Sequence, residues 1–144
     1  MSKGEFLFEE IEVGHTFSPL VYPISQELIT RYVDTVENDD PLHRDFTYAE
    51  RAGYRGIIAP PTIAALYVLK AYRTDSVPPT GGVHSRQRFK FYGPIQAGDV
   101  LHVQARVVDK YVKKGRRFLV IESLARNQRG KEVVWSESTS FWPS

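Results

Sequence analysis

The sequence predicts an α+β fold in which a long antiparallel sheet wraps around one buried helix. The first observation is the apolar stretch Ile57–Tyr72, IIAPPTIAALYVLKAY, whose residues from Ile63 on cover the whole circumference of a helix, with only Lys70 interrupting the apolar coat. The second is that the chain from Val83 onward alternates like four consecutive strands of roughly ten residues, each about 33 Å long. A helix without a polar face has to be surrounded, and these strands are long enough to surround it.

The composition is that of one globular domain over residues 1–144, with 42% hydrophobic and 25% charged residues. The chain contains no cysteine, which excludes disulfides, thiolate zinc sites and cysteine nucleophiles and suits a reducing cytoplasm, where we expect the protein to work. The first residues, MSKGEFLFEEIEVG, lack an apolar signal segment, and no stretch approaches the roughly 18 apolar residues of a membrane span, so we expect no membrane partner. A formal charge of +2 is too small to favour a nucleic-acid partner.

The first elements of the chain carry clear local signals. Pro19 and Pro23 restrict hydrogen bonding in TFSPLVYPI, so this segment is expected to form an edge strand. Ser25 is the expected N-cap of an amphipathic helix over QELITRYVDTVE, because the apolar residues of that segment fall on one helical stripe.

The segment between this helix and the buried helix is polar and then turns helical again. Pro41 disfavours a helical conformation for the residue before it, so the run ENDD ends the first helix. Thr47 and Glu50 form a capping-box pattern that predicts a short helix, which Gly53 would terminate. Pro61 then stands in the first turn of the buried helix, where proline is tolerated.

The strands that follow alternate between two faces and are separated by the turns GPIQAGD, KKGR and NQRG. In VHSRQRFKFY, aromatic residues on one face alternate with the basic residues Arg86, Arg88 and Lys90 on the other. In the next strand, one face carries Leu101, Val103, Ala105 and Val107. A meander of this kind around a single helix is the hot-dog arrangement. The alternative on pattern alone is a generic α+β sandwich with a helix on one face.

The polar loop ENDDPLHRD is where the sequence concentrates groups that carry chemistry. His43 lies close in sequence to Asn38, Asp39, Asp40 and Asp45. Carboxylates beside a histidine can hold a water molecule and take up its proton, or they can simply keep a surface loop soluble. The other histidines show no ligand spacing with His43, so we expect no metal.

A family resemblance becomes visible in this region. The segment DDPLHRDFTYAERAGYRGIIAPPT, together with FEEIEVG near the start and FYGPIQAGDVL between strands, resembles the MaoC-like hydratases and dehydratases of fatty-acyl thioesters. The resemblance spans most of the chain. It implies a hot-dog fold, usually a dimer that pairs two sheets side by side, and addition or removal of water across the α,β double bond of an acyl-CoA or acyl-carrier thioester. It implies no cofactor.

The resemblance transfers only part of the family's catalytic loop, in which an Asp and a His flank one water molecule. His43 and Pro41 match the family pattern, whereas Asn38 stands where the family has its catalytic Asp, and Asp40 stands where it has an Asn. An amide cannot accept the water's proton. We therefore expect Asp40 or Asp39 to replace the usual Asp beside His43, and Asn38→Asp to raise activity.

The start of the buried helix also departs from the family. There the resembled enzymes place a glycine whose N–H binds the thioester oxygen, and this chain has Pro61, which has no N–H. The N–H of Thr62 is the nearest substitute. These departures resemble those of a branch of non-catalytic halves and partner subunits, in which one hot-dog cradles the acyl chain while another performs chemistry. The alternatives to a hydratase or dehydratase are therefore an acyl-binding subunit that pairs with another hot-dog protein and, more weakly, a hot-dog thioesterase.

Basic residues on two strands are candidates for contacts with CoA. The hairpin KKGRR contributes Arg116 and Arg117, and the preceding strand contributes Arg86 and Arg88. Arginine offers charge-assisted donors to phosphate. The alternative for the hairpin is an ordinary solvated turn.

Overall fold

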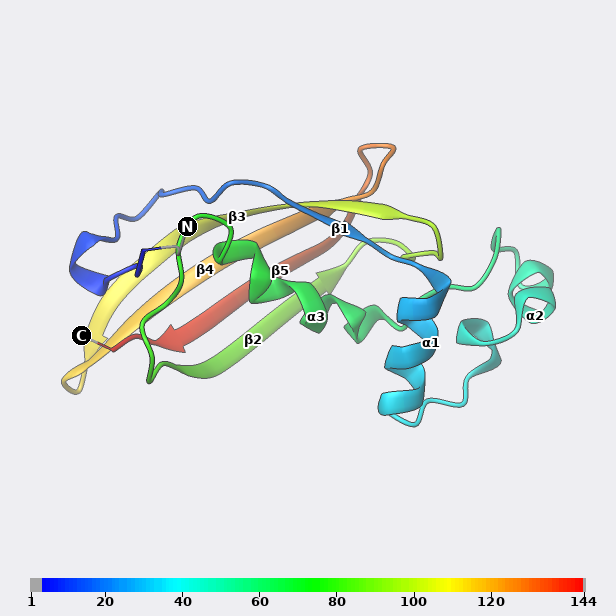
Figure 1. Ribbon diagram of the computed structural model, residues 1–144, viewed down its shortest axis with the longest axis horizontal. Helices are drawn as coiled ribbons and strands as arrows, with labels where there is room; N and C mark the ends of the chain where they lie inside the picture. The colour runs from blue at the N-terminus through cyan, green and yellow to red at the C-terminus, as the bar shows by residue number, and fades with distance from the viewer. Residues whose placement is uncertain (1–3, 144) are drawn as a thin grey trace.

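Five strands form one antiparallel sheet that curves around a short helix (Figure 1) in the computed structural model, which describes residues 4–143. The strand order across the sheet is β1-β3-β4-β5-β2, with bounds β1 Leu20–Pro23, β2 Val83–Phe91, β3 Val100–Lys113, β4 Arg116–Arg126 and β5 Glu132–Phe141. The helical segments are η1 Phe8–Glu10, α1 Gln26–Thr35, η2 Pro41–His43, α2 Phe46–Arg51, η3 Pro61–Ala64, α3 Ala65–Val68 and η4 Lys70–Tyr72. The predicted α+β architecture with a sheet wrapped around a helix is confirmed.

The two edges of the sheet are different. β1 has four residues and pairs with β3, as the prolines around it predict. β2 has nine residues and pairs with β5 along its whole length. In the described part of the chain the other side of β2 pairs with no strand.

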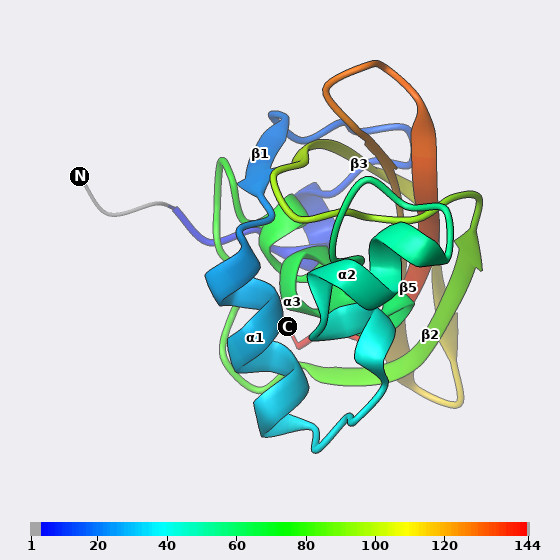
Figure 2. The same cartoon turned by 90° about the vertical axis from the view of Figure 1, so that its right-hand side faces the viewer.

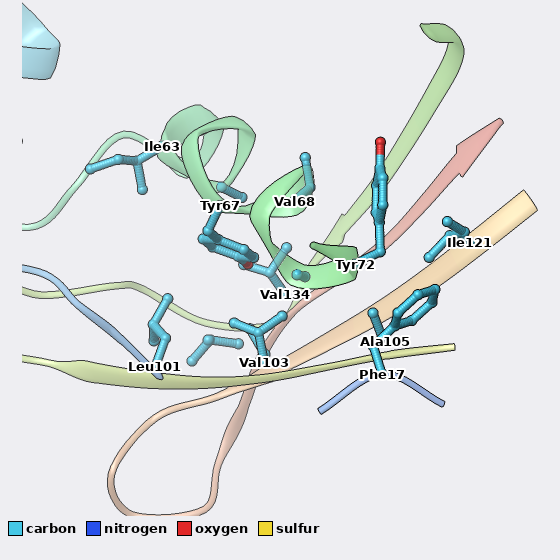
Figure 3. Close-up of a cluster of buried hydrophobic side chains, with 14 of the residues drawn as sticks. Phe17, Ile63, Tyr67, Val68, Tyr72, Leu101, Val103, Ala105, Ile121 and Val134 are labelled. Atoms are coloured by element: carbon cyan, nitrogen blue, oxygen red, sulfur yellow. The ribbon is translucent and has the colours of Figure 1, made fainter. Parts of the chain in front are cut away.

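The alternation predicted for the strands is confirmed by their burial. The apolar face of β3 is fully covered, because Leu101, Val103, Ala105 and Val107 are all buried. Figure 3 shows Ile63 and Tyr67 of the central helix pointing toward Leu101 and Val103 of β3, and all four belong to one core cluster. The hairpin between β3 and β4 turns at Lys114 and Gly115, which both have a positive φ, as a tight two-residue turn requires.

The buried helix differs from its prediction in two ways. The stretch from Pro61 to Tyr72 is helical throughout but consists of a 3₁₀ turn, one α-helical turn and another 3₁₀ turn. It is also not covered on every side, because Ala65 and Lys70 are exposed and Leu66 and Leu69 are only partly buried. The reason is that the sheet of one chain curves around one side of the helix and leaves the other side open. The expectation of a helix with no face left for water was therefore wrong for the single chain.

The helices α1, η2 and α2 gather at one end of the sheet, in front of the viewer in Figure 2. Ser25 caps α1 as predicted, since its Oγ accepts a hydrogen bond from the Leu28 N–H at 3.0 Å. The predicted capping box at Thr47 is wrong, because the carboxylate of Asp45 caps α2 by accepting from the Tyr48 N–H at 3.1 Å. Asp45 lies two residues before Thr47, so α2 already begins at Phe46 and Thr47 lies inside the helix. In the described residues, no helix is long and apolar enough to span a membrane.

Candidate active site

His43 is held by a single strong contact that fixes its protonation pattern. Its side chain is only 8% exposed, and its Nδ1 lies 2.7 Å from the carbonyl oxygen of Ile58. A carbonyl can only accept a hydrogen bond, so Nδ1 carries the proton and Nε2 of the neutral ring is an unprotonated acceptor. The Ile58 N–H in turn donates to the carbonyl of Leu42 at 3.2 Å. Residues 42–43 and Ile58 therefore clamp the polar loop to the approach of the buried helix.

Asp40 is the carboxylate that faces this free nitrogen. Its Oδ2 lies 4.0 Å from His43 Nε2, while its Oδ1 accepts the Leu42 N–H at 3.0 Å and caps the 3₁₀ turn η2. The same turn therefore positions both groups. A separation of 4.0 Å is too long for a direct hydrogen bond. Both atoms are acceptors, so a water molecule that lies between them would donate one proton to each.

Asn38 and Asp39, which precede Asp40 in the loop, differ in the contacts that they make. The Oδ1 of Asn38 accepts the Asp40 N–H at 2.9 Å, so this amide holds the loop backbone. Asp39 is exposed and, among the contacts of the described residues, has no hydrogen bond or ion pair. Of the two carboxylates that the sequence left open, the structure therefore brings Asp40 to His43.

Arg44 is a positioning residue that the sequence analysis missed. Its Nε donates to the carbonyl of Asn38 at 2.7 Å, and its guanidinium pairs with Asp34 of α1 at 2.7 Å. It ties both ends of the loop to the helix before it. A single arginine among several acidic residues was the only signal in the sequence, and it did not show which acid Arg44 would reach.

Thr62 occupies the place expected for a donor to the thioester oxygen. Pro61 has no N–H, and the Ile63 N–H donates to the carbonyl of Pro60 at 2.9 Å. The Thr62 N–H has no backbone acceptor among the hydrogen bonds of residues 4–143. Its hydroxyl accepts a hydrogen bond from the Tyr32 hydroxyl at 2.8 Å, which fixes the helix start against α1.

An apolar pocket of about 350 Å³ opens beside this helix start. We call it the helix-start pocket. Its lining comes from the approach to the helix, from the end of β2 and from the turn after it, and includes Tyr54, Ile58, Ala59, Pro61, Phe91 and Tyr92. No charged side chain lines it. Ile58 lines this pocket, and its carbonyl oxygen contacts the His43 ring, so the pocket and the polar loop share this residue.

The arginines predicted to contact CoA lie away from His43. The hairpin with Arg116 and Arg117 is at the opposite end of the sheet (Figure 1), and Arg117 pairs with Glu9 at 3.0 Å. Arg88 pairs with Glu137 at 3.3 Å and lies over the ring of Trp135 on the outer face. Arg86 is exposed near the start of β2. Within one chain the structure does not bring these four arginines to the candidate site.

A family model for the FAS1-like dehydratase domain region matches residues 12–136. Among sequence relatives, a UPF0336 protein of Saccharopolyspora erythraea is 34% identical over 134 residues, which cover 88% of this chain and 86% of that protein. A UPF0336 protein of Thermobifida fusca is 31% identical over 124 residues, which cover 82% of this chain and 82% of that protein.

Solved structures agree with the fold over nearly the whole chain. The (R)-hydratase PhaJ1 of Pseudomonas aeruginosa superposes with a TM-score of 0.82 at 24% identity, covering 97% of this chain and 87% of that one. A MaoC-like dehydratase of Rhodospirillum rubrum has a TM-score of 0.79 at 23% identity, with coverages of 96% and 98%. The HadBC 3R-hydroxyacyl-ACP dehydratase complex of Mycobacterium tuberculosis has a TM-score of 0.76 at 27% identity, with coverages of 90% and 96%. These matches confirm the predicted hot-dog fold.

Proposed function

This chain belongs to the family of FAS1-like dehydratase domains, and from that premise we propose that it adds or removes water across the α,β double bond of an acyl thioester. The predicted resemblance to MaoC-like hydratases and dehydratases is confirmed at the level of the family. The observation that carries the proposal is the pair of acceptors, His43 Nε2 and Asp40 Oδ2, held 4.0 Å apart. They lie beside a helix start and an apolar pocket.

The geometry supports a simple order of events for hydration. Water between His43 and Asp40 donates to both acceptors, and its oxygen attacks the β-carbon as one proton leaves for His43 Nε2. The electron pair of the double bond moves towards the carbonyl, and the enolate oxygen that forms accepts a hydrogen bond from the Thr62 N–H. The proton carried by the His43–Asp40 pair then returns to the α-carbon. Dehydration is the reverse sequence.

A second candidate function is an acyl-binding subunit that works only beside another hot-dog chain. The observation that favours it is the missing N–H at Pro61, together with the open side of the central helix. The structurally similar HadBC, a 3R-hydroxyacyl-ACP dehydratase, is also a complex. In either function we propose a dimeric protein of fatty-acyl metabolism in the cytoplasm, acting on a CoA or acyl-carrier thioester.

The test measures the absorbance of the conjugated enoyl-thioester group of a substrate over time in the presence of the purified protein. Hydration of the double bond lowers this absorbance. We expect His43→Ala to lower the hydration rate by about 10²–10⁴ because it removes the base. The matched control is Asp39→Ala, which removes an exposed carboxylate of the same loop and should leave the rate nearly unchanged. Equal rates for His43→Ala and the parent would contradict the proposal. Activity that arises only on mixing with a second hot-dog protein would select the second candidate function.

A further inference from the structure

The segment at residues 54–59, which leads into the central helix, borders two cavities. Ile58 and Ala59 line the helix-start pocket. Ile57 lines a separate cavity of about 380 Å³, and Asp99 lines it too. We call this segment the connector. Because open space adjoins it in two places, side-chain packing holds the connector less firmly than it holds the core, and hydrogen bonds carry more of its position.

Two backbone hydrogen bonds tie the connector to the turn at residues 95–99. The Ala59 N–H donates to the Ile95 carbonyl at 2.7 Å, and the Ala97 N–H donates to the Ile57 carbonyl at 2.9 Å. On the connector, these two bonds flank the residue whose carbonyl accepts a hydrogen bond from the histidine ring of the candidate site. The position of that carbonyl therefore depends on the position of the turn.

Asp99 closes this turn with both its backbone and its side chain. Its N–H donates to the Gln96 carbonyl at 3.0 Å, and its Oδ2 accepts the Gln96 N–H at 2.8 Å. Its carbonyl oxygen accepts the Ile24 N–H at 2.8 Å, so the turn is also anchored to the segment before α1. Gly98, which has a φ of 93°, supplies the backbone conformation that lets the chain turn back.

The carboxylate of Asp99 is buried, and each of its oxygens accepts one hydrogen bond. The residue is 4% exposed, and Oδ1, the oxygen that does not bond to the turn, accepts from Gln128 Nε2 at 3.0 Å. The Oε1 of Gln128 accepts the Val100 N–H at 3.0 Å, which fixes the orientation of this amide. A carboxylate accepts through both oxygens, whereas an asparagine has one acceptor oxygen, so Asp99→Asn removes one of the two bonds.

We propose that Asp99 is a positioning residue for His43. Its carboxylate fixes the turn at residues 95–99, the turn holds the connector, and the connector presents the Ile58 carbonyl that keeps the proton of the His43 ring on Nδ1. This inference rests on the proposed function, in which Nε2 accepts a proton from water. When the turn is loosened, the carbonyl moves and the ring can carry its proton on either nitrogen. A ring protonated on Nε2 cannot act as the base.

The first test separates kcat from KM. Asp99→Asn keeps the size of the side chain and should lower kcat for enoyl-thioester hydration about tenfold, with KM changed less than about threefold, because a misplaced base slows the chemical step. The matched control is Asp75→Asn. The Asp75 carboxylate likewise accepts from a backbone N–H and from a side chain, both of Ser18, but in the segment before β1. This control should leave kcat nearly unchanged, and equal losses in the two variants would overturn the proposal.

The second test measures the histidine ring itself and needs no turnover. The NMR resonances of the His43 ring nitrogens, assigned by their absence in His43→Ala, distinguish a protonated nitrogen from an unprotonated one. At about pH 8, where histidine rings are generally neutral, the parent should carry the proton on Nδ1 alone. Asp99→Asn should add a population with the proton on Nε2, and Asp75→Asn should not. An unchanged ring signal in Asp99→Asn, or the same change in both variants, would overturn the proposal.

A milder variant, Gln128→Ala, decides the question if Asp99→Asn does not fold. It changes an exposed residue, leaves Asp99 in place and removes the donor to Oδ1, so the ring signal should shift in the same direction and by less. A parental ring signal in that variant would then overturn the proposal. A shifted ring signal in a protein that hydrates none of the substrates supports the positioning role and contradicts the proposed function. A parental ring signal in both variants of an active enzyme does the opposite.

Discussion

The two ends of the central helix present opposite chemistry. At the start, His43 and Asp40 lie beside an apolar pocket that is lined by no charged side chain. At the end, Arg73 and His84 line a cavity without carboxylates. The difference teaches that one chain keeps the groups of the proposed proton transfer apart from the basic groups that line the cavity at the second end. If proton transfer takes place at the first end, changes there should lower kcat far more than changes at the second end.

Besides His43→Ala, the largest effect at the first end is expected from Thr62→Pro. Proline removes the N–H that we assign to the enolate oxygen, and loss of one such donor costs about 10²–10³ in kcat. A proline in the first turn of a helix keeps the later hydrogen bonds, but it disfavours the helical conformation of Pro61 before it, so thermal unfolding is measured to show that the fold persists. Tyr32→Phe is the control, because it removes the hydrogen bond to the Thr62 hydroxyl and keeps the N–H. If both variants lowered kcat equally, the backbone donor would have no role.

A smaller loss is expected from Asp40→Asn, which keeps the cap on η2 and removes the negative charge beside His43. We expect kcat for enoyl-thioester hydration to fall about 10²-fold, because the water then loses one of its two acceptors. Asp39→Asn, next to it in the loop, should change kcat less than about twofold. Steady-state kinetics on both variants decide between the two carboxylates. A greater loss in Asp39→Asn would show that the loop is arranged differently when substrate is bound.

The smallest effect concerns the proposed dimer, in the arrangement where two copies pair antiparallel along the edge strand β2. If the two-fold axis passes Gln87, Arg86 of one subunit lies opposite Arg88 of the other, and opposed like charges cost roughly 0.2–1 kcal/mol per pair. Raising the salt concentration from about 0.05 to about 0.5 M should therefore tighten the dimer about two- to tenfold. Analytical ultracentrifugation measures this dissociation constant, and Arg86→Gln should remove most of its salt dependence. A dimer that weakens with salt would exclude this register.

Features that depend only on residues close in sequence were predicted well. The alternation in β3 identified its buried face, and Ser25 was recognised as the N-cap of α1. The family resemblance placed the candidate site in the loop with His43. Prediction failed where two nearby residues of similar chemistry competed. Both Asp45 and Thr47 are good helix caps, and the backbone conformation at Asp45 decided between them.

Contacts between distant segments were decided only by the tertiary structure. The carbonyl that fixes the His43 ring belongs to Ile58, fifteen positions later, and the sequence gives no sign of it. The choice of Asp40 over Asp39 depends on a single 3₁₀ turn, because moving one residue along that turn changes which carboxylate faces the ring. The cavity that Arg73 and His84 line combines four segments of the chain. Periodicity and capping act over a few residues, so the sequence by itself determined the elements and their faces. Which atoms meet depends on the path of the whole chain, and only the folded structure decided that.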